Sequence, residues 1–201
     1  MIEEYIKRTI QLEKLDCCII SFGGCGTHYL ANNLQAKNLI VRSATWVNYL
    51  CHYPKYIELN IPIIYLYGNL REAFISQLRN NFAKKNYKIL NTVVKRKYSN
   101  ENFFLSMYEQ FERFIENKNV VKITYKDLFN KVKMIDLYKF LNIKDHSFSK
   151  LYDKPNQFNY DNYKIIFDKH EDKINYVNSF VLKAKDILLD LEKDGATKCV
   201  K

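Results

Sequence analysis

The placement of glycine constrains this sequence more than any other feature. The chain has 201 residues and only five glycines, and three of them, Gly23, Gly24 and Gly26, fall in one short turn. The apolar run at 17–22 (CCIISF) precedes this turn and is typical of a strand buried on both faces of a parallel sheet. Residues 27–35 then suit a helix.

Such a turn can bind an anion. Glycine permits a positive φ and a close approach of the backbone to a ligand, and free amides at the N-terminus of the next helix attract phosphate. The sequence therefore predicts a phosphate-binding turn between a strand and a helix. The alternative is an ordinary tight turn without a ligand.

Strand and helix patterns alternate along most of the chain. Apolar runs predict strands at 62–67 and 120–124, and 39–42 and 46–51 are shorter strand candidates. Apolar residues at helical spacing predict four further helices, at 69–83, 103–115, 132–141 and 169–192. Parallel strands need long, usually helical, crossovers. The alternation therefore predicts one α/β domain over residues 1–201, with helices on both faces of a central parallel sheet.

The helix expected after the strand at 62–67 has a clear start signal. Asn69 is a suitable N-cap, and Glu72 stands three residues later, where it can complete a capping box. The buried stripe of this helix is expected to comprise Leu70, Phe74, Leu78 and Phe82. Residues 84–100 are rich in lysine and arginine with few apolar anchors, and they predict a basic surface loop. A second loop is expected at 154–163.

Composition narrows the class of partner and the compartment. The formal net charge of +10 indicates anionic partners without choosing among phosphates, sulfates, nucleic acid and acidic glycans. No apolar stretch approaches the roughly 20 residues that span a bilayer, and the charged N-terminal segment is unlike a secretory signal. We therefore expect a cytoplasmic protein. Five cysteines without paired metal-ligand spacing indicate reduced, mostly buried thiols and no metal site: Cys17, Cys18, Cys25, Cys51 and Cys199.

Four segments resemble motifs of the sulfotransferase family, in the same order along the chain. Residues 21–30 (SFGGCGTHYL) are similar to the loop that binds the phosphosulfate group in these enzymes. Residues 64–76 (IYLYGNLREAFIS) resemble their strand-and-helix motif, which ends in a serine. Residues 121–128 (VKITYKDL) and 140–143 (FLNI) resemble the strand ending in Y-E-D-L and the F-L-G motif after it. The Walker A lysine is missing, which disfavours an ATPase or kinase.

The resemblance implies a three-layer αβα fold of the P-loop NTPase type and a metal-independent reaction. The donor would be PAPS (3′-phosphoadenosine 5′-phosphosulfate), and the acceptor an unidentified small molecule or glycan with a hydroxyl or amine. The family pattern assigns the turn amides to the phosphosulfate, Ser76 to the ribose phosphate, and Tyr29 and Tyr125 to positions near adenine. The candidate donor-binding residues are Gly23, Gly24, Cys25, Gly26, Thr27, His28, Tyr29, Arg71, Ser76 and Tyr125.

His52 is the candidate catalytic residue. Residues 51–54 (CHYP) stand where many sulfotransferases carry K-[TS]-H-x-P, whose histidine is the general base. An imidazole that is neutral near pH 7 can accept the proton of an acceptor hydroxyl as the sulfuryl group transfers. The structural alternative is a packed or surface histidine before a proline turn.

Two positions depart from the family pattern. Gly24 replaces a lysine or arginine of the loop, and Gly68 replaces the arginine that grips the ribose phosphate. Replacement charge is expected from Arg71, Arg79, a lysine of 84–100, or a protonated His28. The alternative function is a catalytically inactive module that binds a nucleotide or another anionic partner. Nucleic acid is not expected as a partner, because no motif for reading it is present.

Overall fold

The computed structural model describes residues 2–41, 52–148 and 158–183. Within them, three parallel strands form one sheet in the order β1-β2-β3: β1 (Cys18–Ile20), β2 (Ile63–Tyr67) and β3 (Val121–Thr124). In register, Ile19 pairs with Ile64, which in turn pairs with Val121. This confirms the predicted α/β class and the parallel sheet. The strand candidate at 39–42 is wrong over Leu39 to Val41, whereas residue 42 and the candidate at 46–51 lie outside the described residues.

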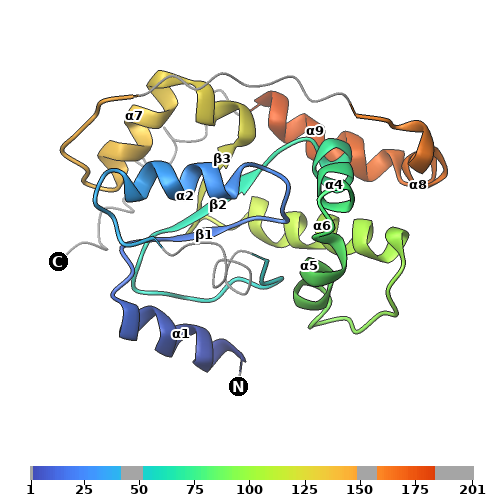
Figure 1. The fold of residues 1–201 in the computed structure, drawn as a ribbon, viewed down its shortest axis with the longest axis horizontal. Coiled ribbons are helices and arrows are strands. Elements are labelled where there is room, and N and C mark those ends of the chain that lie inside the picture. Colours follow the sequence, from blue (N-terminus) through green and yellow to red (C-terminus); the bar gives the residue numbers. More distant parts are fainter. Residues whose placement is uncertain (1, 42–51, 149–157, 184–201) are drawn as a thin grey trace.

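Helices make up most of the remaining described chain (Figure 1). The α-helices and the two 3-10 helices (η) are α1 (Ile2–Glu13), α2 (Thr27–Gln35), α4 (Leu70–Arg79), α5 (Ala83–Leu90), α6 (Asn100–Ile115), η1 (Tyr125–Phe129), α7 (Lys131–Phe140), η2 (Asp161–Tyr163), α8 (Lys164–Lys169) and α9 (Glu171–Lys183). The bounds of α2 agree with the predicted helix at 27–35, and α6 and α7 confirm the helices predicted near 103–115 and 132–141.

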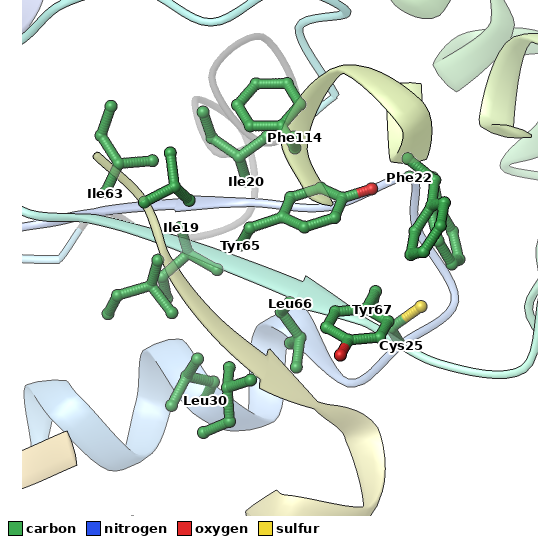
Figure 2. Packing of buried hydrophobic residues seen from close by; sticks show 14 of the residues in the cluster. Ile19, Ile20, Phe22, Cys25, Leu30, Ile63, Tyr65, Leu66, Tyr67 and Phe114 are labelled. Atoms are coloured by element: carbon green, nitrogen blue, oxygen red, sulfur yellow. The ribbon is translucent and has the colours of Figure 1, made fainter. Parts of the chain in front are cut away.

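Helices cover both faces of the sheet. Every residue of β2 is buried. The Tyr65 ring stacks on Phe114 of α6, with ring centroids 5.0 Å apart. The next residue, Leu66, points to the opposite face, where Figure 2 shows Leu30 of α2. The sheet therefore lies between α6 and α2, an arrangement compatible with the three layers that the sequence predicts.

The helix after β2 begins as predicted but ends earlier. The side chain of Asn69 accepts the amide hydrogens of Arg71 and Glu72, at 3.0 and 3.2 Å. The helix ends at Arg79, because Asn81 adopts a left-handed φ of 58°. Phe82 follows this break and is 48% exposed, so its predicted place in the buried stripe is wrong.

The predicted basic loop at 84–100 is wrong over its first half. Residues Ala83–Leu90 form α5, an amphipathic helix that buries Tyr87 and Leu90 and leaves its lysines exposed. The hydroxyl of Tyr87 donates to the carbonyl oxygens of Arg96 and Lys97, at 2.7 and 3.1 Å, and so fastens the following loop to the helix. The loop was predicted from the density of lysine and arginine, and this criterion overlooks the apolar residues that lie between the lysines.

The C-terminal segment is helical where it is described. The helix predicted at 169–192 is present as α9, whose Ile174 and Val177 are fully buried, and residues 184–192 lie outside the described part. The loop predicted at 154–163 contains the short turn η2, and residues 154–157 are not described.

Candidate anion site at the glycine turn

The glycine turn connects β1 to α2 and has a left-handed backbone. Gly23, Gly24 and Gly26 have φ angles of 94°, 70° and 79°. The hydroxyl of the buried Ser21 accepts the amide hydrogen of Gly23 at 2.8 Å and lies 3.1 Å from the hydroxyl of Thr27. Ser21 therefore ties the beginning of the turn to the first residue of α2.

Within the described chain, the turn leaves a group of backbone amides without hydrogen-bond partners. Among residues 2–41, 52–148 and 158–183, no acceptor takes the amide hydrogens of residues 24–28. Gly26 is the N-cap of α2 and supplies no side-chain cap. Gly24 and His28 are exposed, so part of the turn faces solvent. Free amides at the positive end of a helix form an environment that favours an anion.

Packing as well as φ requires glycine in this turn. A Cβ atom on Gly24 would lie 2.5 Å from the carbonyl oxygen of Ala73 in α4. A Cβ atom on Gly26 would lie 3.0 Å from side-chain atoms of Leu128 and Tyr125 in η1. The backbone of the turn is therefore held between α4 and η1, and no side chain fits at position 24 without a shift of α4.

His52 lies directly against the turn, where the motif resemblance places it. Its Nδ1 is 2.8 Å from the carbonyl oxygen of Ser21, so Nδ1 carries a hydrogen that it donates. A Cβ atom on Gly23 would lie 3.1 Å from Cε1 of this imidazole. With Nδ1 protonated, Nε2 of the neutral ring is an acceptor, and no described residue forms a hydrogen bond with it.

Burial sets the protonation state of His52. Desolvation lowers its pKa from the ordinary 6.5 to about 4, although the hydrogen bond to Ser21 acts in the opposite direction. Electrostatic interactions with His28 and Lys85 lower this pKa further. The imidazole is therefore neutral at pH 7, the state that a general base requires.

The two candidate aromatic residues lie together on the η1 side of the turn. The Tyr29 ring stacks on Phe129 with centroids 5.8 Å apart and an interplanar angle of 9°. Tyr125 meets the same Phe129 ring edge to face, at 5.2 Å. The sequence analysis did not single out Phe129, which lies between the two tyrosines and links them.

The other two candidates lie on α4 and have different surroundings. The guanidinium carbon of Arg71 is 5.6 Å from the centre of the Phe167 ring in α8, so this charge is directed toward α8. Its buried Nε has no partner among the described residues. Ser76 is half-buried, and its carbonyl oxygen accepts the side-chain amide of Asn80 at 2.9 Å. The structure thus brings the turn, His52, Tyr29 and Tyr125 together, whereas no hydrogen bond or ion pair within the described chain joins Arg71 or Ser76 to the turn.

Sequence analysis missed two buried amides beside the turn. Gln77 of α4 and Asn86 of α5 are 6% and 3% exposed, and the Asn86 side chain donates to Oε1 of Gln77. A Cβ atom on Gly23 would lie 2.8 Å from Nε2 of Gln77. The available signal was a polar residue four positions after Ala73, on the helix face that contacts the turn.

The cysteines and acidic residues give no metal site in the described part of the chain. It contains no group of three or more His, Cys, Asp or Glu side chains that could hold a metal ion. Cys17, Cys18 and Cys25 are free and buried, and burial raises the pKa of Cys18 to about 12. Cys51 and Cys199 lie outside the described residues. None of the described helices combines the length and apolar character that crossing a membrane requires.

Comparisons with known proteins identify no relative of this chain. A scan of protein-family models finds no match. Searches of curated proteins and of solved structures also find no match. Functional inference therefore depends on the chemistry of the turn and its neighbours.

Proposed function

We propose that this chain is a sulfotransferase with a P-loop-like αβα fold that binds PAPS at the glycine turn. The observation that carries the proposal is a neutral, buried imidazole placed against a turn whose amides at 24–28 have no hydrogen-bond partner among the described residues. The amides would hold the phosphosulfate, and the bound donor would supply the sulfuryl group. Tyr29 and Tyr125, which share the Phe129 ring, would border the adenine.

His52 would act as the general base through Nε2. The acceptor hydroxyl or amine gives its proton to Nε2 while its oxygen or nitrogen bonds to sulfur. The bond between sulfur and the bridging phosphate oxygen breaks, and adenosine 3′,5′-bisphosphate leaves with that electron pair. Ser21 would hold the imidazole in the required tautomer through its carbonyl oxygen, 2.8 Å from Nδ1. A bound dianion beside the ring would raise the pKa of His52 from about 4 toward the operating range.

The charge that the family places at positions 24 and 68 would come from other residues. His28 is exposed in the first turn of α2, next to the free amides. Lys85 lies on α5 beside Asn86, and its charge acts on His52. Lys85 belongs to the lysine-rich segment 84–100, one of the expected sources of replacement charge.

A conservative substitution of the base tests the proposal. For His52→Gln, we expect unchanged affinity for adenosine 3′,5′-bisphosphate by calorimetry and a loss of about a hundredfold or more in transfer of labelled sulfate. The glutamine keeps a donor for the Ser21 carbonyl but cannot accept the proton. Failure of the wild-type protein to bind either PAPS or its bisphosphate product at millimolar concentration would exclude this function.

One observation favours a second candidate, the non-catalytic binding module. The carbonyl oxygen of Ala73 lies where a side chain at position 24 would begin, so α4 presents an acceptor where the family presents a cation. Loss of a well-placed donor costs a catalyst about a hundredfold or more. Tight binding of the bisphosphate, with no transfer to a broad panel of hydroxyl and amine acceptors, would support this candidate.

A further inference from the structure

The side chain of Gln77 lies next to His52 on the glycine turn. A Cβ atom on Gly23 would be 2.8 Å from Nε2 and 2.9 Å from Cδ of Gln77, and 3.1 Å from Cε1 of His52. The amide and the imidazole therefore lie side by side over Gly23. Both side chains are buried, with 6% and 5% of their surface exposed. A residue larger than glycine at position 23 would displace one of them.

The neighbouring helix contacts one end of the Gln77 amide. The Asn86 side chain on α5 donates to Oε1 of Gln77, which uses the acceptor end of this amide. The donor end, Nε2, forms no hydrogen bond with any residue in the described ranges. Nε2 lies next to Gly23 and is not fully enclosed, so it can donate to an anion bound beside the free backbone amides of the turn.

We propose that Gln77 is a specificity-determining residue that donates a hydrogen bond from Nε2 to the terminal sulfuryl oxygens of the donor. This inference rests on the proposed function, because it assigns a role at the same turn. Asn86 acts as a positioning residue through its bond to Oε1. A neutral donor suits this place, since a cation in contact with His52 would depress the basicity that transfer requires.

Binding measurements with two nucleotides separate this role from a structural one. Adenosine 3′,5′-bisphosphate lacks the sulfuryl group, so Gln77 should contribute to PAPS affinity alone. For Gln77→Glu, which keeps the acceptor for Asn86 but removes the donor, we expect PAPS affinity to fall at least about tenfold. Bisphosphate affinity should change less than about threefold. Gln77→Met should weaken the binding of PAPS by a smaller factor, because methionine adds no negative charge that repels the sulfuryl group.

Gln35→Met provides the matched control. Gln35 is a half-buried amide at the far end of α2 that donates to the carbonyl oxygen of Val41, away from the turn. This variant should bind both nucleotides as the wild type does. Gln77 has a structural role if Gln77→Glu lowers the affinity for both nucleotides equally and shifts thermal unfolding to the same extent as Gln35→Met. That result would overturn the inference. Unchanged PAPS affinity in both Gln77 variants would overturn it as well.

A probe without a nucleoside distinguishes failure of the inference from failure of the proposed function. Inorganic pyrophosphate and sulfate are titrated into the labelled protein while the side-chain amide of Gln77 and the backbone amides of residues 24–28 are followed by NMR. Joint shifts would support Gln77 as a hydrogen-bond donor to an anion at the turn, even if PAPS does not bind. Shifts of the turn without Gln77 would overturn the inference alone, and no shift with either anion would overturn both.

Discussion

His52 illustrates how one backbone contact and burial determine the chemistry of a single residue. The carbonyl oxygen of Ser21 accepts from Nδ1, and desolvation keeps the ring neutral. The hydrogen bond depends on the end of β1, which places the Ser21 carbonyl against the imidazole. The same contact that orients the ring also makes the protein sensitive to acid.

We expect the free energy of unfolding to fall between pH 6.5 and pH 4. The pKa of His52 is about 4 in the folded protein and near 6.5 in the unfolded chain, so the unfolded chain binds more protons over this interval. The contribution is fully present above pH 6.5 and is lost progressively as the pH falls, by up to about 3 kcal/mol at pH 4.

Urea unfolding of the wild type and of His52→Gln from pH 7.5 to pH 4 measures this contribution. Other groups that titrate in this range affect both proteins, so the difference between the two curves isolates the imidazole. Parallel curves would contradict the assignment of a buried neutral histidine.

At the residue scale, the sequence identified candidate residues more reliably than it identified their contacts in the folded protein. The glycine turn and His52 were identified because each occurs in a recognisable local pattern, and the structure places them together. Gln77 was not identified, because its role depends on contact with Gly23 and Asn86, which are 54 and 9 positions away in sequence. Arg71 was assigned to the donor from its position near a motif, yet its guanidinium packs on Phe167.

At the scale of elements, local signals determine where helices begin, and tertiary contacts determine much of the rest. The cap at Asn69 was predicted and confirmed, because capping depends on residues within one turn. The end at Arg79 was not predicted, because it depends on the left-handed Asn81. The helix α5 was mistaken for a loop because the apolar residues that anchor it to α6 alternate with lysines.

The contact between the turn and α4 predicts an unusually costly alanine substitution. Gly24 has a φ of 70°, and a Cβ atom there would lie 2.5 Å from the carbonyl oxygen and 2.8 Å from Cα of Ala73. We expect Gly24→Ala to reduce the free energy of unfolding by about 2 kcal/mol or more, since backbone strain and a clash with a helix backbone add together.

Gly68→Ala is the matched control for that substitution. Gly68 has no positive φ, and its nearest neighbour would be Cβ of Tyr125 at 3.2 Å, which can give way slightly. Its cost by chemical denaturation should be less than half that of Gly24→Ala. Equal costs for the two variants would show that α4 yields to a side chain at position 24.

At the scale of the whole molecule, the sheet is small and the helices supply most of the core. Buried residues from Ile6 in α1 to Val177 in α9 belong to one cluster. The sequence predicted alternation and hence the parallel sheet. The order of the strands and the burial of α1 were not predicted, because they depend on which faces meet across long separations.

The core contains a buried hydroxyl whose removal should stabilise the protein. Tyr65 is fully buried between the sheet and α6, and its hydroxyl has no hydrogen-bond partner in the described chain. We expect Tyr65→Phe to raise the free energy of unfolding by about 1 kcal/mol, because the desolvated hydroxyl is removed while the stacked ring is kept.

Tyr138→Phe supplies the opposite case for comparison. Tyr138 is also fully buried, but its hydroxyl donates to the side chain of Asn33 in α2. We expect this variant to lower the free energy of unfolding by about 1 kcal/mol. Measured by urea denaturation, a loss of stability in both variants would show that the Tyr65 hydroxyl has a partner after all.

The backbone contact between Gly24 and Ala73 also limits how this protein can change. A lysine at position 24 requires a shift of α4, because its Cβ atom would lie 2.5 Å from the carbonyl oxygen of Ala73. A positive charge at position 24 therefore requires an earlier substitution that shifts α4. Without that shift, positive charge at the turn has to come from other positions. The order of mutations, and not only their sum, is therefore constrained at this turn.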